Sequence, residues 1–212
     1  NFLGFRKHVI ERSQVRILAY LHVSFAGIYA FSKTIMYGES QSMHLMAPRD
    51  AVAVAEANRD VIVGIKVRVG LHASGDQGTA PLDVALQVAD EVGMPLMCHI
   101  DHPPPSYEEV VDRLRPGDIL THAFRPFPNS PATQQGTVKK EVLEARKRGV
   151  RFDRMLSSQE IATLITALGR GHIGYSMAMG AVVQMTRELS TEWSARGVRV
   201  NAILPAQVVN PS

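Results

Sequence analysis

Apolar runs of strand length alternate with helical patterns along residues 15–152, and this alternation constrains the fold more than any other feature. The apolar runs lie at 15–23, 61–69, 95–100, 118–122 and 150–152. Helical patterns separate them, at 48–58, 82–92, 107–114 and 138–148. Strand followed by helix at this spacing is typical of βαβ units in a parallel sheet. The runs are mainly apolar, as expected of parallel strands buried on both faces.

The regular repeat favours consecutive units of a (β/α)₈ barrel. A whole barrel needs about 250 residues, so these strands would form only part of one. Polar loops at 24–46 and 123–137 follow strand ends, where barrel enzymes place their chemistry. We therefore predict an α/β fold with a mainly parallel sheet, built over residues 1–153 from partial TIM-barrel-like βα units.

The pattern changes after Asp153. A long amphipathic helix is predicted over 178–193, and an apolar strand over 198–204 is ended by Pro205. We predict that residues 154–212 form a second segment, whose Rossmann-like helix and strand pack on the same sheet. A partial barrel leaves unpaired strand edges, which attract pairing partners. We therefore expect a homo-oligomer, or a fold in which the second segment covers one edge.

Charge and composition exclude several classes of partner. The net charge is +3, and the charges are of both signs and dispersed, as at 141–148. Nucleic-acid binders usually cluster basic residues on one face, so we predict no nucleic-acid partner. We expect no membrane partner, because no apolar run reaches the roughly 20 residues needed to span a bilayer. We also expect no signal peptide. Cys98 is the single cysteine, which fits a reducing compartment and predicts a cytoplasmic location.

Polar residues stand at or near the ends of three of the apolar strands: Lys66, His99 and His122. The carboxyl ends of parallel barrel strands converge on one mouth, so these side chains are expected to meet. Histidine is a good neutral ligand for zinc-like metals. An ammonium group has no lone pair, so a ligating lysine must lose its charge or take another form.

A simpler interpretation competes for each residue, because a lone strand-end histidine more often makes hydrogen bonds in a core. Alternation along the strand points Cys98 away from His99 and into the core. His102 follows the strand and is expected in a loop. His44 and His72 lie in predicted loops, without an identifiable partner.

Residues 1–153 resemble the dihydroorotase-like, deacetylase-type branch of the amidohydrolase superfamily. The resemblance rests on the segments 64–68, 95–100, 103–105, 115–122 and 148–153. It implies that Lys66 is carboxylated and bridges two metals, and that His99 and His122 bind the second metal. It also implies Zn²⁺ or a similar divalent metal, and hydrolysis of an amide, ester or lactone bond in a small-molecule substrate.

Two departures from this family suggest impaired hydrolysis. The family has a His-x-His pair on its first strand, whereas only the isolated His8, His22 and His44 precede Lys66 here. The family's last-strand aspartate, a metal ligand and general base, also has no counterpart in the sequence. Hydrolysis needs both an activated water and an acceptor for its proton.

Residues 155–212 resemble the C-terminal half of short-chain dehydrogenases, most specifically over 197–205. The resemblance implies that Ser158 and Tyr175 polarise a substrate carbonyl beside NAD(P). Met179 stands where the family has a lysine, so Tyr175 would keep an ordinary pKa of about 10. A G-x-G-x-x-G pattern at 169–174 has no strand before it and is weak evidence. The leading hypothesis is the metal-dependent hydrolase; the alternatives are an NAD(P)-dependent short-chain oxidoreductase and a non-catalytic chimera.

Overall fold

The computed structural model of the protein describes residues 2–27 and 39–153. The chain divides into two compact units, Asn1–Met155 and Leu156–Ser212. The division lies close to the change in sequence pattern at residue 153. The predicted helix at 178–193, the predicted strand at 198–204 and their packing on the sheet lie outside the described residues.

The first unit is built on a parallel sheet of five strands in the order β1-β2-β3-β4-β5. The strands are β1 (Ala19–His22), β2 (Ile62–Val69), β3 (Leu96–Ile100), β4 (Ile119–Thr121) and β5 (Arg151–Phe152). Doubly wound sheets reverse their strand order at a switch point, whereas barrels place consecutive strands side by side. The strand order therefore confirms the predicted α/β fold with a parallel sheet of barrel-like units.

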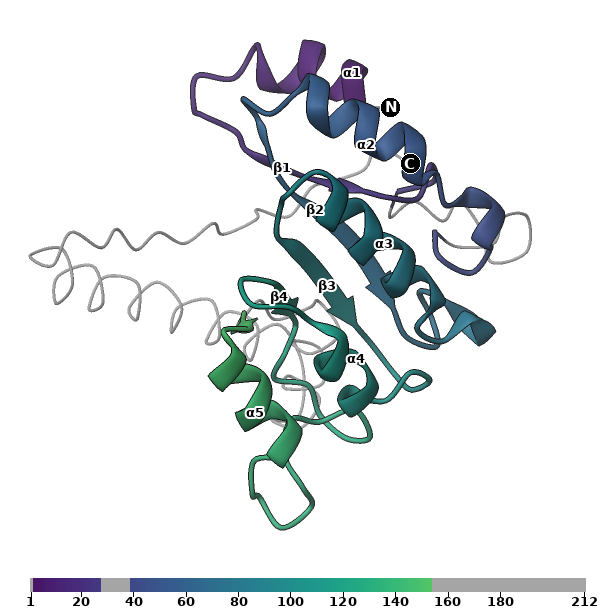
Figure 1. Ribbon diagram of the computed structural model, residues 1–212, viewed down its shortest axis with the longest axis vertical. Coiled ribbons are helices and arrows are strands. Elements are labelled where there is room, and N and C mark those ends of the chain that lie inside the picture. The colour runs from purple at the N-terminus through teal and green to yellow at the C-terminus, as the bar shows by residue number, and fades with distance from the viewer. Residues whose placement is uncertain (1, 28–38, 154–212) are drawn as a thin grey trace, which may run out of the picture. The chain divides into compact units, whose positions relative to one another are not determined.

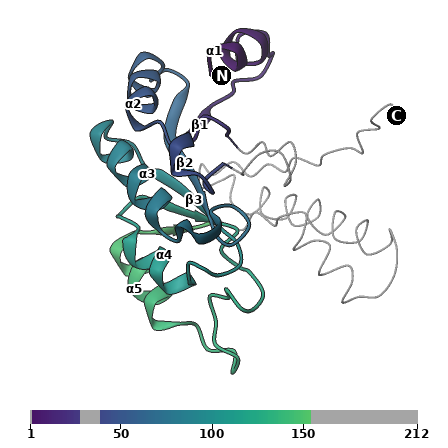
Figure 2. The same ribbon diagram turned by 90° about the vertical axis from the view of Figure 1, so that its right-hand side faces the viewer.

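One α-helix follows each of the first four strands. These helices are α2 (Pro48–Ala57), α3 (Ala80–Glu91), α4 (Tyr107–Arg113) and α5 (Lys140–Arg148). They lie on one side of the strands, as in the outer ring of a barrel (Figures 1 and 2). A short helix α1 (Phe2–Phe5) and a π-helical turn η1 (Arg6–Ile10) precede β1, and the loops contain 3₁₀ turns η2 (Met43–Leu45) and η3 (Gly75–Gln77).

Alternation along the strands separates an apolar face from a polar face. In β2, Ile65 and Val67 are fully buried in the core that the helices cover. Lys66 and Arg68 alternate with them and therefore point to the opposite side of the sheet. Cys98 is fully buried in the same core, which confirms its prediction as a core residue. We call the side of the sheet that carries Lys66, Arg68 and His99 the polar face.

Two predicted elements are longer than those observed. The strand predicted at 15–23 begins only at Ala19, which pairs with Ile62 at the start of β2. Val15, before that point, is 69% exposed, so the first residues of the apolar run are not buried. The helix predicted from residue 138 begins at Lys140, because Val138 forms a β-bridge with Ala132 instead.

The turn before β4 anchors that strand beside β3. Asp118 is buried, and its carboxylate accepts hydrogen bonds from the backbone N–H groups of Leu96 and Arg115, both at 2.8 Å. The Arg115 guanidinium also donates to Asp118 and to the carbonyl of Met94. This turn fixes the register of neighbouring strands at their amino ends, so it positions the site without belonging to it.

Candidate metal centre

The register of the sheet gathers the polar side chains in two rows. His22 on β1 is paired with Lys66 on β2. One step further along, Arg68 is paired with His99, and His99 with Thr121 on β4. Paired residues of adjacent parallel strands point to the same side of a sheet. These residues therefore share the polar face near the carboxyl ends of the strands.

His99 and His122 meet edge to face, with ring centroids 4.8 Å apart and an interplanar angle of 76°. Simple alternation would turn His122 away from the face that Thr121 shares with His99. His122, however, has a left-handed backbone with φ of 58°, which is uncommon outside glycine. With this backbone conformation, the His122 ring lies against His99. The conformation carries a strain of about 1–3 kcal/mol, of the kind concentrated at functional sites.

His99 offers a neutral imidazole. Burial lowers the pKa of His99 to about 3, although the nearby Asp101 carboxylate acts in the opposite direction. Its Nε2 atom lies 3.5 Å from Arg68 Nη2 and 3.8 Å from Asp101 Oδ2. The Arg68 guanidinium can only donate and the Asp101 carboxylate can only accept, so the contact with Arg68 requires the tautomer whose Nε2 lone pair is free. A neutral imidazole is the form that binds metals.

Lys66 lies on the same face in a buried environment. Burial lowers the pKa of Lys66 to about 8, and the neighbouring Arg68 lowers it further, whereas Cys98, Glu39 and Asp153 act to raise it. The Lys66 charge in turn lowers the pKa of His99, so the two side chains are within electrostatic reach. A lysine must lose its charge before it can bind a metal. The lowered pKa makes the uncharged amine of Lys66 easier to form than that of an exposed lysine.

Sequence reasoning missed the carboxylate of Glu39, which is 5% exposed. Its Oε1 lies 2.7 Å from Arg68 Nη1, and its Oε2 lies 3.1 Å from His22 Nε2. His22 Nδ1 accepts a hydrogen bond from the backbone N–H of Ser24, which places the ring proton on Nε2, facing Glu39. Glu39 comes from a loop with no periodic pattern, so nothing in the sequence signalled it.

Two further carboxylates stand after strand ends. Asp153 follows β5, and its Oδ2 accepts a hydrogen bond from Thr121 Oγ1 at 2.9 Å. Asp101 follows β3 and lies with His72 and His102 in a group whose potential ligand atoms are within 4.8 Å of one another. No partner for His72 was predicted, but its ring centroid lies 5.4 Å from that of His102.

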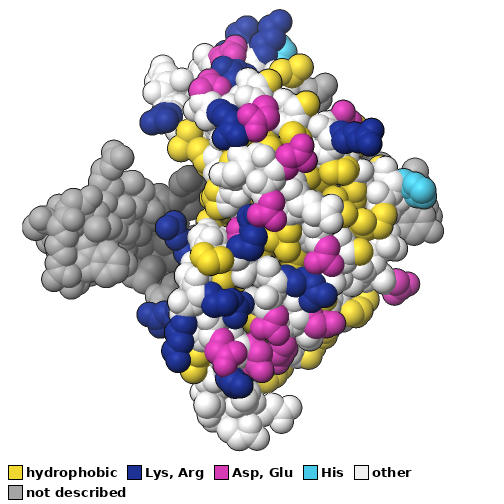
Figure 3. Space-filling model, in the orientation of Figure 1, with side chains coloured by type: hydrophobic (Ala, Val, Ile, Leu, Met, Phe, Trp, Pro, Cys, Tyr) yellow, Lys and Arg dark blue, Asp and Glu magenta, His cyan; other side chains and the backbone are white. Residues whose placement is uncertain are grey.

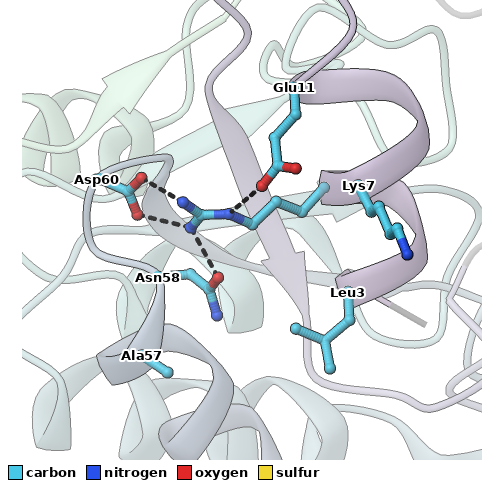
Figure 4. A pocket seen from close by; sticks show the side chains of 7 residues that line it. Leu3, Lys7, Glu11, Ala57, Asn58 and Asp60 are labelled. Carbon is cyan, nitrogen blue, oxygen red and sulfur yellow. Dashed lines mark hydrogen bonds and ion pairs between the residues drawn. The ribbon is translucent and has the colours of Figure 1, made fainter.

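A surface pocket lies away from these residues, beside α1 and the end of α2 (Figure 4). Arg6 spans it and donates to Asp60, Asn58 and Glu11. Asp60 precedes β2, so the pocket lies toward the amino ends of the strands, opposite the histidines. Its contacts fix the N-terminal helical segment to the α2–β2 connection, and we assign the pocket a structural role.

The surface carries no strong bias of charge where it can be seen. On the face drawn in Figure 3, Lys and Arg side chains are interspersed with Asp and Glu. None of the helices in residues 2–27 and 39–153 combines the length and the hydrophobicity of a membrane-spanning segment.

The sheet, its helices and the histidines at its carboxyl ends define an amidohydrolase-like barrel segment. A deacetylase of Brucella anthropi is 31% identical over 153 residues, which is 72% of this chain and 37% of that protein. The chain thus spans well under half of this relative. Two solved structures cover 72% of this chain: a dihydroorotase, with a TM-score of 0.63 and 29% identity, and an adenine deaminase, with a TM-score of 0.65 and 27% identity. The matches span 41% and 40% of those chains.

Short stretches match dehydrogenases instead. A glucose 1-dehydrogenase of Gluconobacter oxydans is 45% identical over 40 residues, which is 19% of this chain and 15% of that protein. A galactitol 2-dehydrogenase of Cereibacter sphaeroides is 56% identical over 34 residues, which is 16% of this chain and 13% of that protein. These matches fit the short-chain dehydrogenase resemblance of the second segment, whose Ser158 and Tyr175 lie outside the described residues. No family model matches the chain.

Proposed function

We propose that the chain carries a metal centre of a metal-dependent hydrolase of the amidohydrolase type, acting on an amide, ester or lactone bond of a small molecule. His99, His122 and a carboxylated Lys66 would hold Zn²⁺ or a similar divalent ion. The observation that carries the proposal is the contact of the His99 and His122 rings, 4.8 Å apart. They meet at the carboxyl ends of adjacent strands in a segment similar in sequence to deacetylases.

The donor set fits such an ion. Zinc accepts neutral imidazole nitrogens, and burial keeps His99 neutral. A metal on His99 Nε2 would replace its contact with Arg68. The guanidinium would remain held by Glu39, whose carboxylate contacts the other terminal nitrogen, Nη1, at 2.7 Å. The charge balance supports this arrangement, because Glu39 offsets the positive charge that Arg68 brings beside a cation.

Carboxylation explains how Lys66 could ligate. Its uncharged Nζ would attack the carbon of CO₂, form a C–N bond and release one proton, leaving a carbamate. A carbamate offers anionic oxygen ligands where an ammonium group offers none. Only the neutral amine has the lone pair for this attack, and burial lowers the pKa of Lys66 to about 8. The environment therefore favours the reactive form.

The bound ion would supply polarisation of the scissile carbonyl and activation of a water. The chain itself would position the ion and shield its ligands on the polar face.

The proposal is tested by metal content and by turnover together. We would express the parent and a His99→Ala/His122→Ala variant in zinc-supplemented medium and measure zinc per folded chain. The parent should hold about one more zinc than the variant, because the variant loses both imidazole ligands. Any zinc-dependent hydrolysis of amide, ester or lactone substrates should vanish in His122→Ala. Equal zinc in the two proteins would overturn the proposal.

A second candidate is an NAD(P)-dependent short-chain oxidoreductase, favoured by the short dehydrogenase matches. Ser158 and Tyr175 would polarise the substrate carbonyl. Met179 counts against it, because a thioether cannot supply the positive charge of the family's lysine. Cofactor-dependent turnover that is lost in Tyr175→Phe would support it. If neither His122→Ala nor Tyr175→Phe changes any activity, a non-catalytic chimera remains.

A further inference from the structure

The loops that follow β2 and β3 bring together two imidazoles and a carboxylate outside the centre proposed above. We propose that His72, Asp101 and His102 form a separate binding site for a zinc-like transition-metal dication. Their potential ligand atoms lie within 4.8 Å of one another. Its ligands include none of Lys66, His99 and His122, although Asp101 Oδ2 lies 3.8 Å from His99 Nε2. The inference does not depend on the hydrolase proposal.

The carboxylate is held in place before any ion arrives. Asp101 is 5% exposed. Its Oδ1 accepts from the backbone N–H of His72 and its Oδ2 from that of Ala73, each at 3.1 Å. Each carboxylate oxygen has a second lone pair. The His99 ring lies beside Oδ2, at 3.8 Å, so Oδ1 is the oxygen better placed to ligate. Backbone donors that orient a ligating carboxylate are a regular part of metal sites.

Further contacts fix the loops that carry the histidines. The backbone N–H of Leu71 donates to the carbonyl of His102 at 2.7 Å, which ties one loop to the other. Asn129 Nδ2 donates to the carbonyl of Asp101 at 2.7 Å and to that of Pro105 at 3.0 Å. A side chain at Gly70 would collide with the Asp101 carboxylate, because its Cβ would lie 2.2 Å from Oδ1. The backbone around the three ligands is therefore constrained on several sides.

The ligand atoms need to move only a short distance to bind one ion. Tetrahedral ligands about 2.0–2.1 Å from zinc are separated by roughly 3.3 Å. His72 is exposed and His102 half-buried, so either ring can turn by the ångström or so that remains. Two nitrogens and one oxygen suit Zn²⁺, Co²⁺ or Ni²⁺ better than Mg²⁺ or Ca²⁺, which prefer oxygen ligands. Three protein ligands would leave one coordination position open to a small molecule.

The test is a calorimetric zinc titration of the full chain after chelator treatment. We would compare the parent with His72→Ala/His102→Ala and with a control, His8→Ala/His44→Ala, that removes two exposed histidines elsewhere. The first variant should lose about one equivalent of bound zinc, and the control none. A His72→Gln/His102→Gln variant serves if the alanine variant fails to fold. Unchanged stoichiometry and affinity in the folded variant would overturn the inference.

The same titration separates this site from the hydrolase centre. His99→Ala/His122→Ala should keep the equivalent that His72→Ala/His102→Ala loses. If zinc binding is undiminished in His99→Ala/His122→Ala and falls only in His72→Ala/His102→Ala, the hydrolase proposal fails and this site stands. If it falls only in His99→Ala/His122→Ala, this site fails and the hydrolase centre stands.

Discussion

The backbone of His122 shows how single residues build the candidate centre. Strand alternation alone would point the His122 side chain away from His99. With its left-handed φ of 58°, the ring of His122 instead contacts that of His99. His99 itself is neutral because it is buried, and Lys66 is more easily deprotonated for the same reason. Burial on the polar face therefore favours the uncharged forms of both nitrogen groups.

The Lys66 side chain should make stability depend on pH in a defined direction. Its pKa is lowered from 10.5 to about 8 in the folded protein. Between these pH values the unfolded chain holds more protons, so the free energy of unfolding should rise with pH. The rise would amount to roughly 3 kcal/mol. Urea unfolding of metal-free protein in CO₂-free buffer measures it.

Lys66→Met isolates this effect. The variant should be more stable than the parent at neutral pH, because it buries no charge, and its advantage should shrink as the pH rises. Lys147→Met, which changes an exposed lysine, serves as the control and should follow the parent. If the free energies of unfolding of the parent and Lys66→Met changed in parallel with pH, Lys66 would not be buried as described.

Gly70 should tolerate no side chain. It has φ of 131°, and an added Cβ would lie 2.2 Å from Asp101 Oδ1. We expect Gly70→Ala to lower the free energy of unfolding by about 3 kcal/mol, through backbone strain and displacement of Asp101. Gly78→Ala is the matched control: φ is 55°, but nothing lies within 4 Å. It should cost only about 1 kcal/mol. Equal losses in thermal unfolding would contradict the close approach of Gly70 to Asp101.

At the scale of elements, the strands and helices were predictable because they depend on apolar periodicity. The approach of polar strand-end residues was predictable too, since neighbouring parallel strands place His99 and Lys66 on one face. The contacts made by loop residues could not be predicted from the sequence. Glu39 reaches Arg68 from a loop, and His72 meets His102 across two loops. Such contacts depend on turn geometry, which has no period in the sequence.

The turn before β4 should matter for stability more than its exposed surroundings suggest. Asp118 is 1% exposed and accepts from Leu96, Arg115 and the Arg115 guanidinium. Asp118→Ala leaves these donors unpaired and should lower the free energy of unfolding by about 3–5 kcal/mol. Asp112→Ala, on the exposed side of α4, should change it by less than about 0.5 kcal/mol. Chemical denaturation checks both, and a small loss in Asp118→Ala would refute the anchoring role.

At the scale of the whole molecule, the sheet has two edge strands, β1 and β5, each paired on one side within the described residues. Unpaired strand edges attract further strands. We propose that the protein is a homo-oligomer, with a solution mass above that of one chain. Light scattering coupled to size exclusion, over a range of concentrations, measures it. A mass of one chain at every concentration would contradict the proposal.

We propose that His99 and His122 share one metal ion with a carboxylated Lys66. Anomalous diffraction at the zinc edge, from crystals grown with zinc and bicarbonate, would locate that ion. We predict an anomalous peak within about 2.1 Å of a nitrogen of each imidazole, with carbamate density on Lys66 beside it. Ordered density for both rings, with no peak within bonding distance of either, would contradict the account.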